Sequence, residues 1–113
     1  MRRLASDDEE LEAAELQKKA LEEGATPIAE CAPRDRSTVL GTIQSTTLRP
    51  RAGVPTLEAE LYDGTGTLYV VWLGRRQMAG IKTGVKLLVE GRIGVQGNRR
   101  TMYNPRYTLL PAN

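Results

Sequence analysis

Arginine and tyrosine are the residues whose types and spacing in this 113-residue chain indicate chemistry. The arginines come in close pairs, namely Arg49 with Arg51, Arg75 with Arg76, and Arg99 with Arg100. A guanidinium group binds phosphate through two parallel hydrogen bonds and stacks on flat rings. A tyrosine ring offers a surface on which a nucleobase stacks. This combination predicts binding of a polyanion that carries rings.

Catalytic and metal chemistry have little support in the composition. Histidine is absent, which removes the commonest general base and metal ligand. The single cysteine, Cys31, forms neither an intrachain disulfide nor a Cys/His zinc site. Glu58 and Glu60 lie two residues apart on one expected strand face, which could bring their carboxyl groups near the separation of a glycosidase pair, but neither an aromatic sugar platform nor a deep cleft is expected beside them. We therefore expect no enzyme activity, no catalytic residue, no metal and no cofactor.

The charge of the chain is divided unevenly between its two parts. Residues 1–36 hold six Lys/Arg and ten Asp/Glu, whereas residues 37–113 hold ten Lys/Arg and four Asp/Glu. The first part is therefore net −4 and the second net +6. The basic part favours a polyanionic partner, and the acidic part partly cancels that field. With neither a signal-peptide pattern nor an apolar run of about 20 residues, the chain is expected to be cytoplasmic, with no membrane partner.

The pattern of residues 6–23 predicts an acidic helix, with residues 1–24 as an N-terminal unit. Ser6 is its expected N-cap, with Glu9 completing a capping box, and Gly24 is expected to end it. Three hypotheses stay open for this helix. In the first, the helix is solvated or only loosely docked. In the second, it is a surface for a protein partner or for self-association. In the third, it lies over the basic groove and competes with nucleic acid for it.

One face of this expected helix is thinly apolar. It carries Leu4, Leu11, Ala14 and Leu21, while Leu16 lies off it.

Short β patterns replace the helical one after a linker over residues 25–36. Five strands are expected, at 37–48, 56–62, 66–73, 85–95 and 100–110. A short helix is expected between the third and fourth strands, and Gly41 and Gly91 would allow sharp bends. This outline predicts an all-β class, with a five-stranded OB-fold barrel over residues 37–111 and the acidic α-helix before it. An SH3-like barrel is the alternative, but the position of the insertion favours the OB order.

The segments LRPRAGVPTLEAELYDGTGTLYVVWLGRRQMAGIKTG, VEGR and YNPRYTLL give the chain a family likeness. Over residues 26–111 it resembles the small actinobacterial OB-fold nucleic-acid-binding proteins. Their barrel is similar to the wedge domain of branched-DNA helicases of the RecG kind. The resemblance implies nucleic-acid binding without catalysis. The chain lacks a second cysteine near Cys31, which departs from the family pattern.

Binding is expected on the face of the second and third strands, between two basic loops. No acidic residue lies in 48–55 or 95–101, the two segments that contain these loops. The predicted contact residues are Arg49, Arg51, Tyr62, Tyr69, Arg75, Arg76, Arg92, Asn98, Arg99 and Arg100. Tyr103 and Tyr107 are possible additions, and ordinary packing is the alternative for each tyrosine.

Other side chains of the second and third strands have different expected roles. Trp72 alternates with the more apolar set of its strand and is expected in the core. Glu58 and Glu60 oppose phosphate on the binding face, unless they accept from base amino groups or pair with Arg92.

Two functions from different classes follow. The first is a non-enzymatic module that binds nucleic acid with low sequence specificity. Single-stranded or branched DNA is favoured as its partner, and RNA is possible. The second is a protein-interaction module that docks through the N-terminal helix, with the barrel as scaffold. Binding to phosphates would weaken steeply with salt, and that dependence separates the two.

Overall fold

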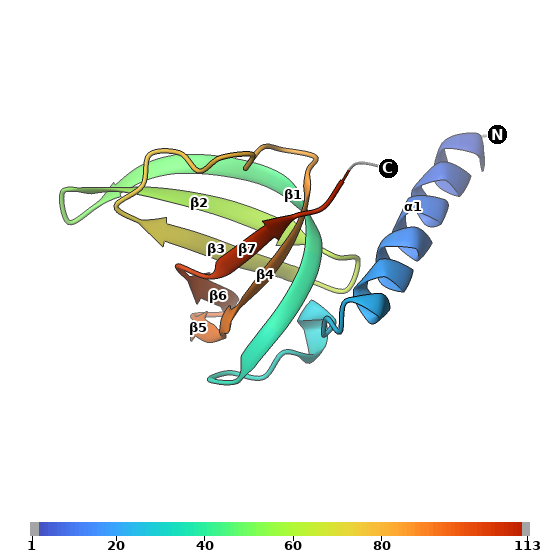
Figure 1. Ribbon diagram of the computed structural model, residues 1–113, viewed down its shortest axis with the longest axis horizontal. Coiled ribbons are helices and arrows are strands. Elements are labelled where there is room, and N and C mark those ends of the chain that lie inside the picture. Colours follow the sequence, from blue (N-terminus) through green and yellow to red (C-terminus); the bar gives the residue numbers. More distant parts are fainter. Residues whose placement is uncertain (1–2, 112–113) are drawn as a thin grey trace.

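The chain folds as one helix followed by a strongly curled sheet (Figure 1). A computed structural model describes residues 3–111, with side chains from Glu10 onward. The helical elements are α1 (Arg3–Glu22) and the 3-10 turn η1 (Ile28–Glu30). The strands are β1 (Arg36–Arg51), β2 (Val54–Tyr62), β3 (Thr67–Leu73), β4 (Lys86–Arg92), β5 (Gly94–Gln96), β6 (Arg99–Tyr103) and β7 (Arg106–Leu109). Their order across the sheet is β5-β6-β3-β2-β1-β4-β7.

The long strand β1 gives the sheet its curl. Its first half, Arg36–Thr42, pairs with β4, and the rest, from Thr42 to Arg51, pairs with β2. A bulge between Ile43 and Ser45 lies just after this change of partner and increases the local twist. A Cβ on Gly41 would lie 2.8 Å from the side chain of Leu61, so only glycine allows the strands to approach this closely.

The sheet is a half-barrel, and the prediction of a closed five-stranded OB barrel is wrong. Seven strands form one mixed sheet, in which β3 and β6 are parallel neighbours and β5 and β7 are separate edges. Two of the expected strands are each divided in two. Ile93 interrupts the fourth, because its N–H donates to Asp35 and its carbonyl accepts from Arg34. The fifth is interrupted at Asn104, which has a φ of 49°, and Pro105, which has no N–H to donate.

The prediction of a short helix between the third and fourth strands is also wrong. Within residues 74–84, three glycines adopt left-handed backbone conformations, with φ values of 76° at Gly74, 77° at Gly80 and 92° at Gly84. Such conformations cannot continue a right-handed helix. The segment instead forms turns, one of them closed by the Ile81 N–H and the Met78 carbonyl.

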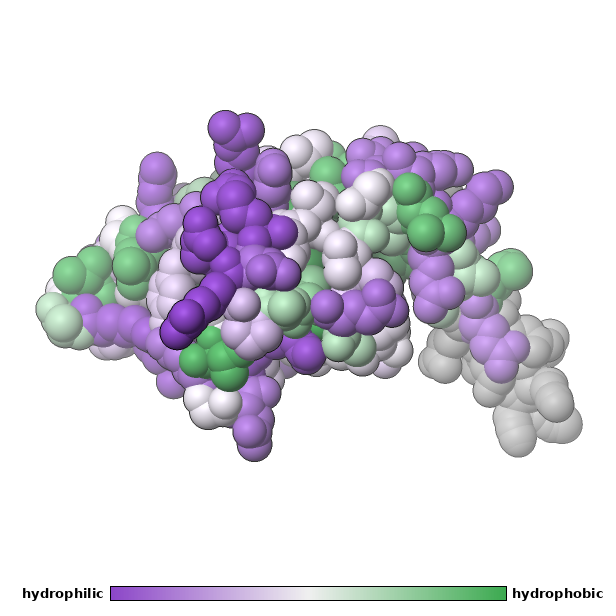
Figure 2. Space-filling view, turned by 90° about the horizontal axis from the view of Figure 1, so that it is seen from below, coloured by the Kyte–Doolittle hydropathy of each residue, from purple (hydrophilic) through white to green (hydrophobic). Residues whose placement is uncertain are grey.

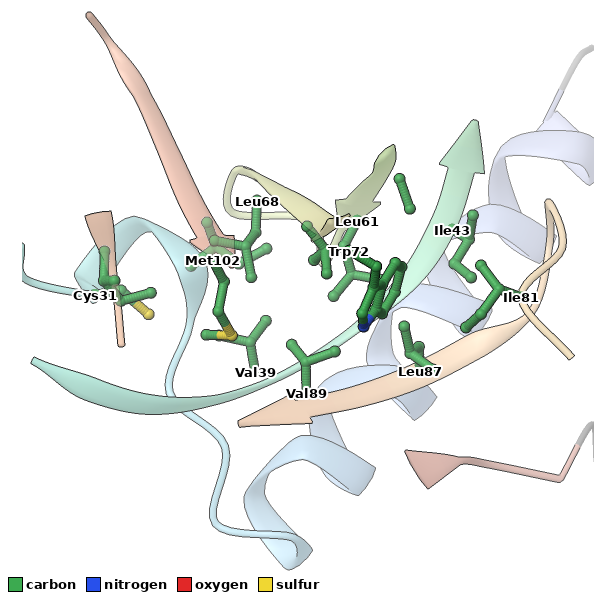
Figure 3. Packing of buried hydrophobic residues seen from close by; sticks show 14 of the residues in the cluster. Cys31, Val39, Ile43, Leu61, Leu68, Trp72, Ile81, Leu87, Val89 and Met102 are labelled. Carbon is green, nitrogen blue, oxygen red and sulfur yellow. The ribbon is translucent and has the colours of Figure 1, made fainter. Parts of the chain in front are cut away.

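The core lies inside the curl of the sheet (Figure 3). Trp72 is 2% exposed, which confirms its predicted place in the core. Its ring meets the Tyr107 ring edge-on, with centroids 5.7 Å apart. The indole N–H is buried without a hydrogen-bond partner among the described residues, so packing alone holds this side chain.

Residues 25–36, expected as a linker, are packed and hydrogen-bonded to the sheet. Ile28 and Cys31 are buried in the core cluster. The Asp63 carboxylate, at the end of β2, accepts from the Ile28 N–H at 2.9 Å. The same carboxylate accepts from the N–H and hydroxyl of Thr65 and from the Gly66 N–H, which shapes the β2–β3 turn. The buried Asp63 side chain therefore fixes both the β2–β3 turn and the segment that leads into β1.

The helix α1 touches the sheet through little of its surface. It begins at Arg3, so Ser6 lies within it and is not its N-cap, while Gly24 follows its end with a φ of 73°. Leu16 is the one leucine of its described side chains that is buried, at 7% exposed, whereas Leu11 and Leu21 face solvent. Leu4 lies outside the described side chains. No helix among residues 3–111 is long and apolar enough to cross a membrane.

Candidate nucleic-acid interface

Alternation along the strands divides the sheet into a core face and an opposite face, which we call the outer face. On β2, Leu57 and Leu61 are buried in the core, so Glu58, Glu60 and Tyr62 point the other way. The pairing registers carry this face across to Tyr69 on β3 and to Thr101 and Tyr103 on β6.

Three tyrosines form a diagonal row across the outer face. Tyr62 lies opposite Thr67, two residues before Tyr69 on β3. Tyr69 lies beside Thr101, two residues before Tyr103 on β6. Each step of the row is therefore a diagonal cross-strand pair, and in an antiparallel pair such as β2–β3 this diagonal measures about 7–8 Å. We call Tyr62, Tyr69 and Tyr103 the tyrosine row; its two ends are 44% and 37% exposed.

An arginine covers the middle of the tyrosine row. The guanidinium carbon of Arg99 lies 4.5 Å from the centroid of the Tyr69 ring. This is the distance of a cation–π contact. Arg99 is exposed, so its charge stays accessible to an anion while its position is held by the ring.

A second cationic group lies on β1 and is organised by one carboxylate. Glu58 accepts from Arg51 Nη2 at 3.0 Å and Nε at 3.3 Å, and its other oxygen lies 3.5 Å from Arg49 Nε. These contacts place two guanidinium groups around one half-buried carboxylate, which leaves one positive charge in excess. Hydrogen bonding to Glu58, and then to Tyr103, raises the pKa of Arg51 above its ordinary value.

Arg49 and Arg51 lie on a paired strand, and their expected loop is much shorter than predicted. β1 and β2 stay in register as far as Arg51 and Val54, and only Ala52 and Gly53 form the turn. Both turn residues have positive φ values, 50° and 80°, as a two-residue hairpin requires. Figure 2 shows hydrophobic side chains at this end of the molecule, where Val54 is exposed.

Arg99 and Arg100 likewise belong to β6, with only Gly97 and Asn98 in the turn after β5. Their side chains point to opposite faces because they are neighbours on a strand. Arg100 turns away from the tyrosine row and donates to the backbone carbonyls of Ala29 and Cys31, both at 3.0 Å.

The remaining predicted residues lie away from the tyrosine row or carry no described contact. Arg92 donates to the Arg34 carbonyl at 2.6 Å. It is on β4, with β1 between it and β2, and Glu58 pairs with the β1 arginines instead. Arg75 and Arg76 lie in the exposed loop after β3 and Asn98 in the exposed turn before β6, and none has a side-chain hydrogen bond among the described residues.

The structure separates the two tyrosines of the last expected strand. Tyr103 joins the row on the outer face, where the Gln96 side-chain amide donates to its hydroxyl. Tyr107 packs against the core cluster. In the sequence both tyrosines lie within β patterns. Asn104 and Pro105 interrupt the alternation between them, which is the signal that the two rings need not lie on the same face of the sheet.

The helix α1 forms one wall of a groove at the Tyr62 end of the outer face. The groove has a volume of about 680 Å³, and its lining includes Glu12, Gln17, Gln44, Tyr62 and Lys86. Figure 1 places α1 at the end of the sheet opposite to the β1–β2 turn. Arg49 and Arg51, which lie next to this turn, are therefore far from the acidic helix.

Comparisons with known proteins find no matching family model and no matching curated protein. Among the described residues, no group of three or more His, Cys, Asp or Glu side chains is placed to hold a metal ion.

Proposed function

We propose that this chain binds single-stranded nucleic acid, without catalysis, along the tyrosine row. The observation that carries the proposal is the diagonal alignment of Tyr62, Tyr69 and Tyr103 with arginines on both sides of it. Base stacking on an aromatic side chain contributes about 1–3 kcal/mol per base and tolerates any sequence. A row of such rings suits unpaired bases, because bases inside a duplex are already stacked.

Electrostatics support the same proposal. Residues 37–113 carry a net charge of +6. Arg49 and Arg51 lie on one side of the row and Arg99 on the other, so a strand laid along the tyrosines has cations near both edges. Glu58 opposes phosphate less than an isolated carboxylate would, because two guanidinium groups already surround it. Single-stranded or branched DNA is the favoured partner, RNA has the same stacking chemistry, and the cytoplasm is the proposed location.

The second candidate is a protein-interaction module, and the exposure of α1 favours it. Leu21 is 81% exposed and Leu11 is 61% exposed, although Leu16 on another side of the helix is docked. A partner that covers Leu11 and Leu21 would use surface that the sheet leaves free. Such binding would respond weakly to salt.

Fluorescence anisotropy of a labelled single strand at 50 and 200 mM salt tests the first candidate. Three neutralised phosphates give a log–log slope of roughly −2, which is about a fifteenfold loss of affinity over this range. Charge reversal in Arg49→Glu and Arg99→Glu should remove most of the binding. Arg106→Glu, on the edge strand β7, is the matched control and should retain it. An affinity that ignores both salt and these substitutions would refute the proposal.

A further inference from the structure

One carboxylate of the outer face differs from its neighbour in what surrounds it. Glu58 is held by Arg49 and Arg51. Glu60, two residues further along β2, is exposed and has no ion pair or side-chain hydrogen bond among the described residues. A negative charge on a surface that otherwise gathers arginines weakens phosphate binding. A site that bound phosphate alone would therefore gain nothing from Glu60.

The position of Glu60 places it beside a stacking ring. It lies directly opposite Tyr69 on β3, and Ser45 is its partner on β1. It is also two residues from Tyr62 on the same face of β2. Glu60 is therefore adjacent to the first two rings of the tyrosine row, on the side of Tyr69 away from Arg99, and a base stacked on that side of Tyr69 would present its edge to the carboxylate. Arg99 approaches Tyr69 from β6, on the opposite side.

The chemistry of a carboxylate selects among base edges. An ionised carboxylate only accepts hydrogen bonds, through two oxygens side by side. The Watson–Crick edge of guanine carries two neighbouring donors, N1–H and the 2-amino group. Adenine and cytosine place one amino group next to an acceptor nitrogen, which repels a carboxylate. Thymine and uracil place one N–H between two carbonyls. Guanine is thus the base whose edge matches both oxygens.

We infer that Glu60 gives the tyrosine row a preference for guanine, by accepting from N1–H and the 2-amino group of a base stacked at Tyr69. This inference rests on the proposed function and adds a base-reading residue to it. Arg99 and the arginines of β1 remain the phosphate contacts, and Glu60 reads the base edge between them. A bidentate pair of this kind discriminates between bases by 1–3 kcal/mol, or about fivefold to 150-fold.

The test uses the full chain and short thymidine strands that carry guanine, hypoxanthine, adenine or cytosine at internal positions. Hypoxanthine is guanine without the 2-amino group, so it isolates one of the two hydrogen bonds. We expect guanine strands to bind about tenfold more tightly than adenine or cytosine strands, with hypoxanthine between them. Glu60→Gln should reduce the preference below about twofold and tighten binding of plain thymidine strands, since a negative charge is lost.

Glu90→Gln is the matched control, because Glu90 is an exposed carboxylate on β4, with β1 between it and β2. It should leave the guanine preference unchanged. Equal affinity for all four strands, with the salt dependence intact, would overturn this inference alone. A guanine preference that survives in Glu60→Gln would also overturn it. Absence of binding to any strand would overturn it together with the proposed function.

Discussion

Arg99 and Arg100 are neighbours in sequence and belong to two different regions of the molecule. Arg99 lies over the Tyr69 ring on the outer face and is exposed. Arg100 is half-buried on the other side of β6 and donates to the carbonyls of Ala29 and Cys31. We call the second region, residues 25–36 with the side chains that hold them, the anchored segment.

The contrast shows that positive charge in a β pattern has two uses that composition cannot separate. In the anchored segment an arginine satisfies backbone carbonyls that packing would otherwise leave without donors. On the outer face Arg99 makes no side-chain hydrogen bond among the described residues and is positioned by the Tyr69 ring. Substitutions in the anchored segment should therefore reduce stability, whereas substitutions on the outer face should reduce affinity for a nucleic acid.

The largest effect is expected for Asp63→Ala, as a loss of stability. Its carboxylate accepts from Ile28, Thr65 and Gly66, so removing it leaves one buried N–H group, that of Ile28, and two part-buried ones without this acceptor. We expect the free energy of unfolding to fall by about 3 kcal/mol, measured by urea denaturation. Asp63→Asn keeps one acceptor oxygen and should lose less. Equal, small losses for both would mean that the anchored segment does not depend on this carboxylate.

The arginine pair gives the most direct contrast. Arg100→Ala should cost about 2 kcal/mol of unfolding free energy, because two charge-assisted hydrogen bonds are lost. Arg99→Ala, which loses an exposed cation–π contact, should cost only about 0.5 kcal/mol. For the affinity toward a labelled single strand we expect the reverse: Arg99→Ala should weaken binding more than Arg100→Ala. If Arg100→Ala folds normally and abolishes binding, the assignment of the two residues to separate regions is wrong.

The sequence predicted the β content and the core better than the closure of the sheet. Alternation identified Trp72 as a core residue because burial follows strand periodicity directly. The curl depends on β1 changing partners at Thr42, which is a long-range pairing that no local pattern encodes. The missing helix in 74–84 could have been anticipated from its three glycines, since each adopts a left-handed conformation.

The docked face of the N-terminal helix was also not predictable from the local sequence pattern. Its thin apolar stripe runs through Leu11 and Leu21, yet the buried leucine is Leu16, which lies off that stripe. A thin stripe does not decide which face docks, because the curvature of the sheet determines which side chain finds a partner.

The candidate site was predicted in composition and only partly in geometry. Tyr62 and Tyr69 were expected on one face from strand alternation, and the pairing of β2 with β3 places them there. Arg100 was grouped with Arg99 as one basic loop, and strand alternation separates the two because β6 already begins at Arg99. The Glu58 cluster was missed because Arg49 and Arg51 belong to β1, which continues beyond its expected end at residue 48.

A smaller effect is expected from the end of the tyrosine row. Tyr103→Ala should weaken single-strand binding about tenfold, since one stacking surface is lost. Its cost in stability should be modest, because the ring is 37% exposed. Tyr107→Ala is the informative comparison, because it removes the ring that packs against Trp72 and should reduce stability instead. Anisotropy and urea denaturation on both variants measure the two effects, and a shared loss of affinity would argue against a row on one face.

The smallest effect concerns Cys31, whose burial raises the pKa of its thiol. An ordinary thiol has a pKa of about 8.5, so the unfolded chain loses this proton at a lower pH than the folded chain. The folded state then binds more protons above pH 8.5, and the free energy of unfolding decreases as the pH rises. The decrease should appear between pH 8 and 9.5 and should be absent in Cys31→Ala, as measured by urea denaturation at each pH. If the free energy of unfolding falls equally with pH in the unsubstituted chain and in Cys31→Ala, the titrating group lies outside the anchored segment. A decrease seen only with Cys31 present would show that the folded state needs this thiol protonated, in the segment that Arg100 hydrogen-bonds to the sheet.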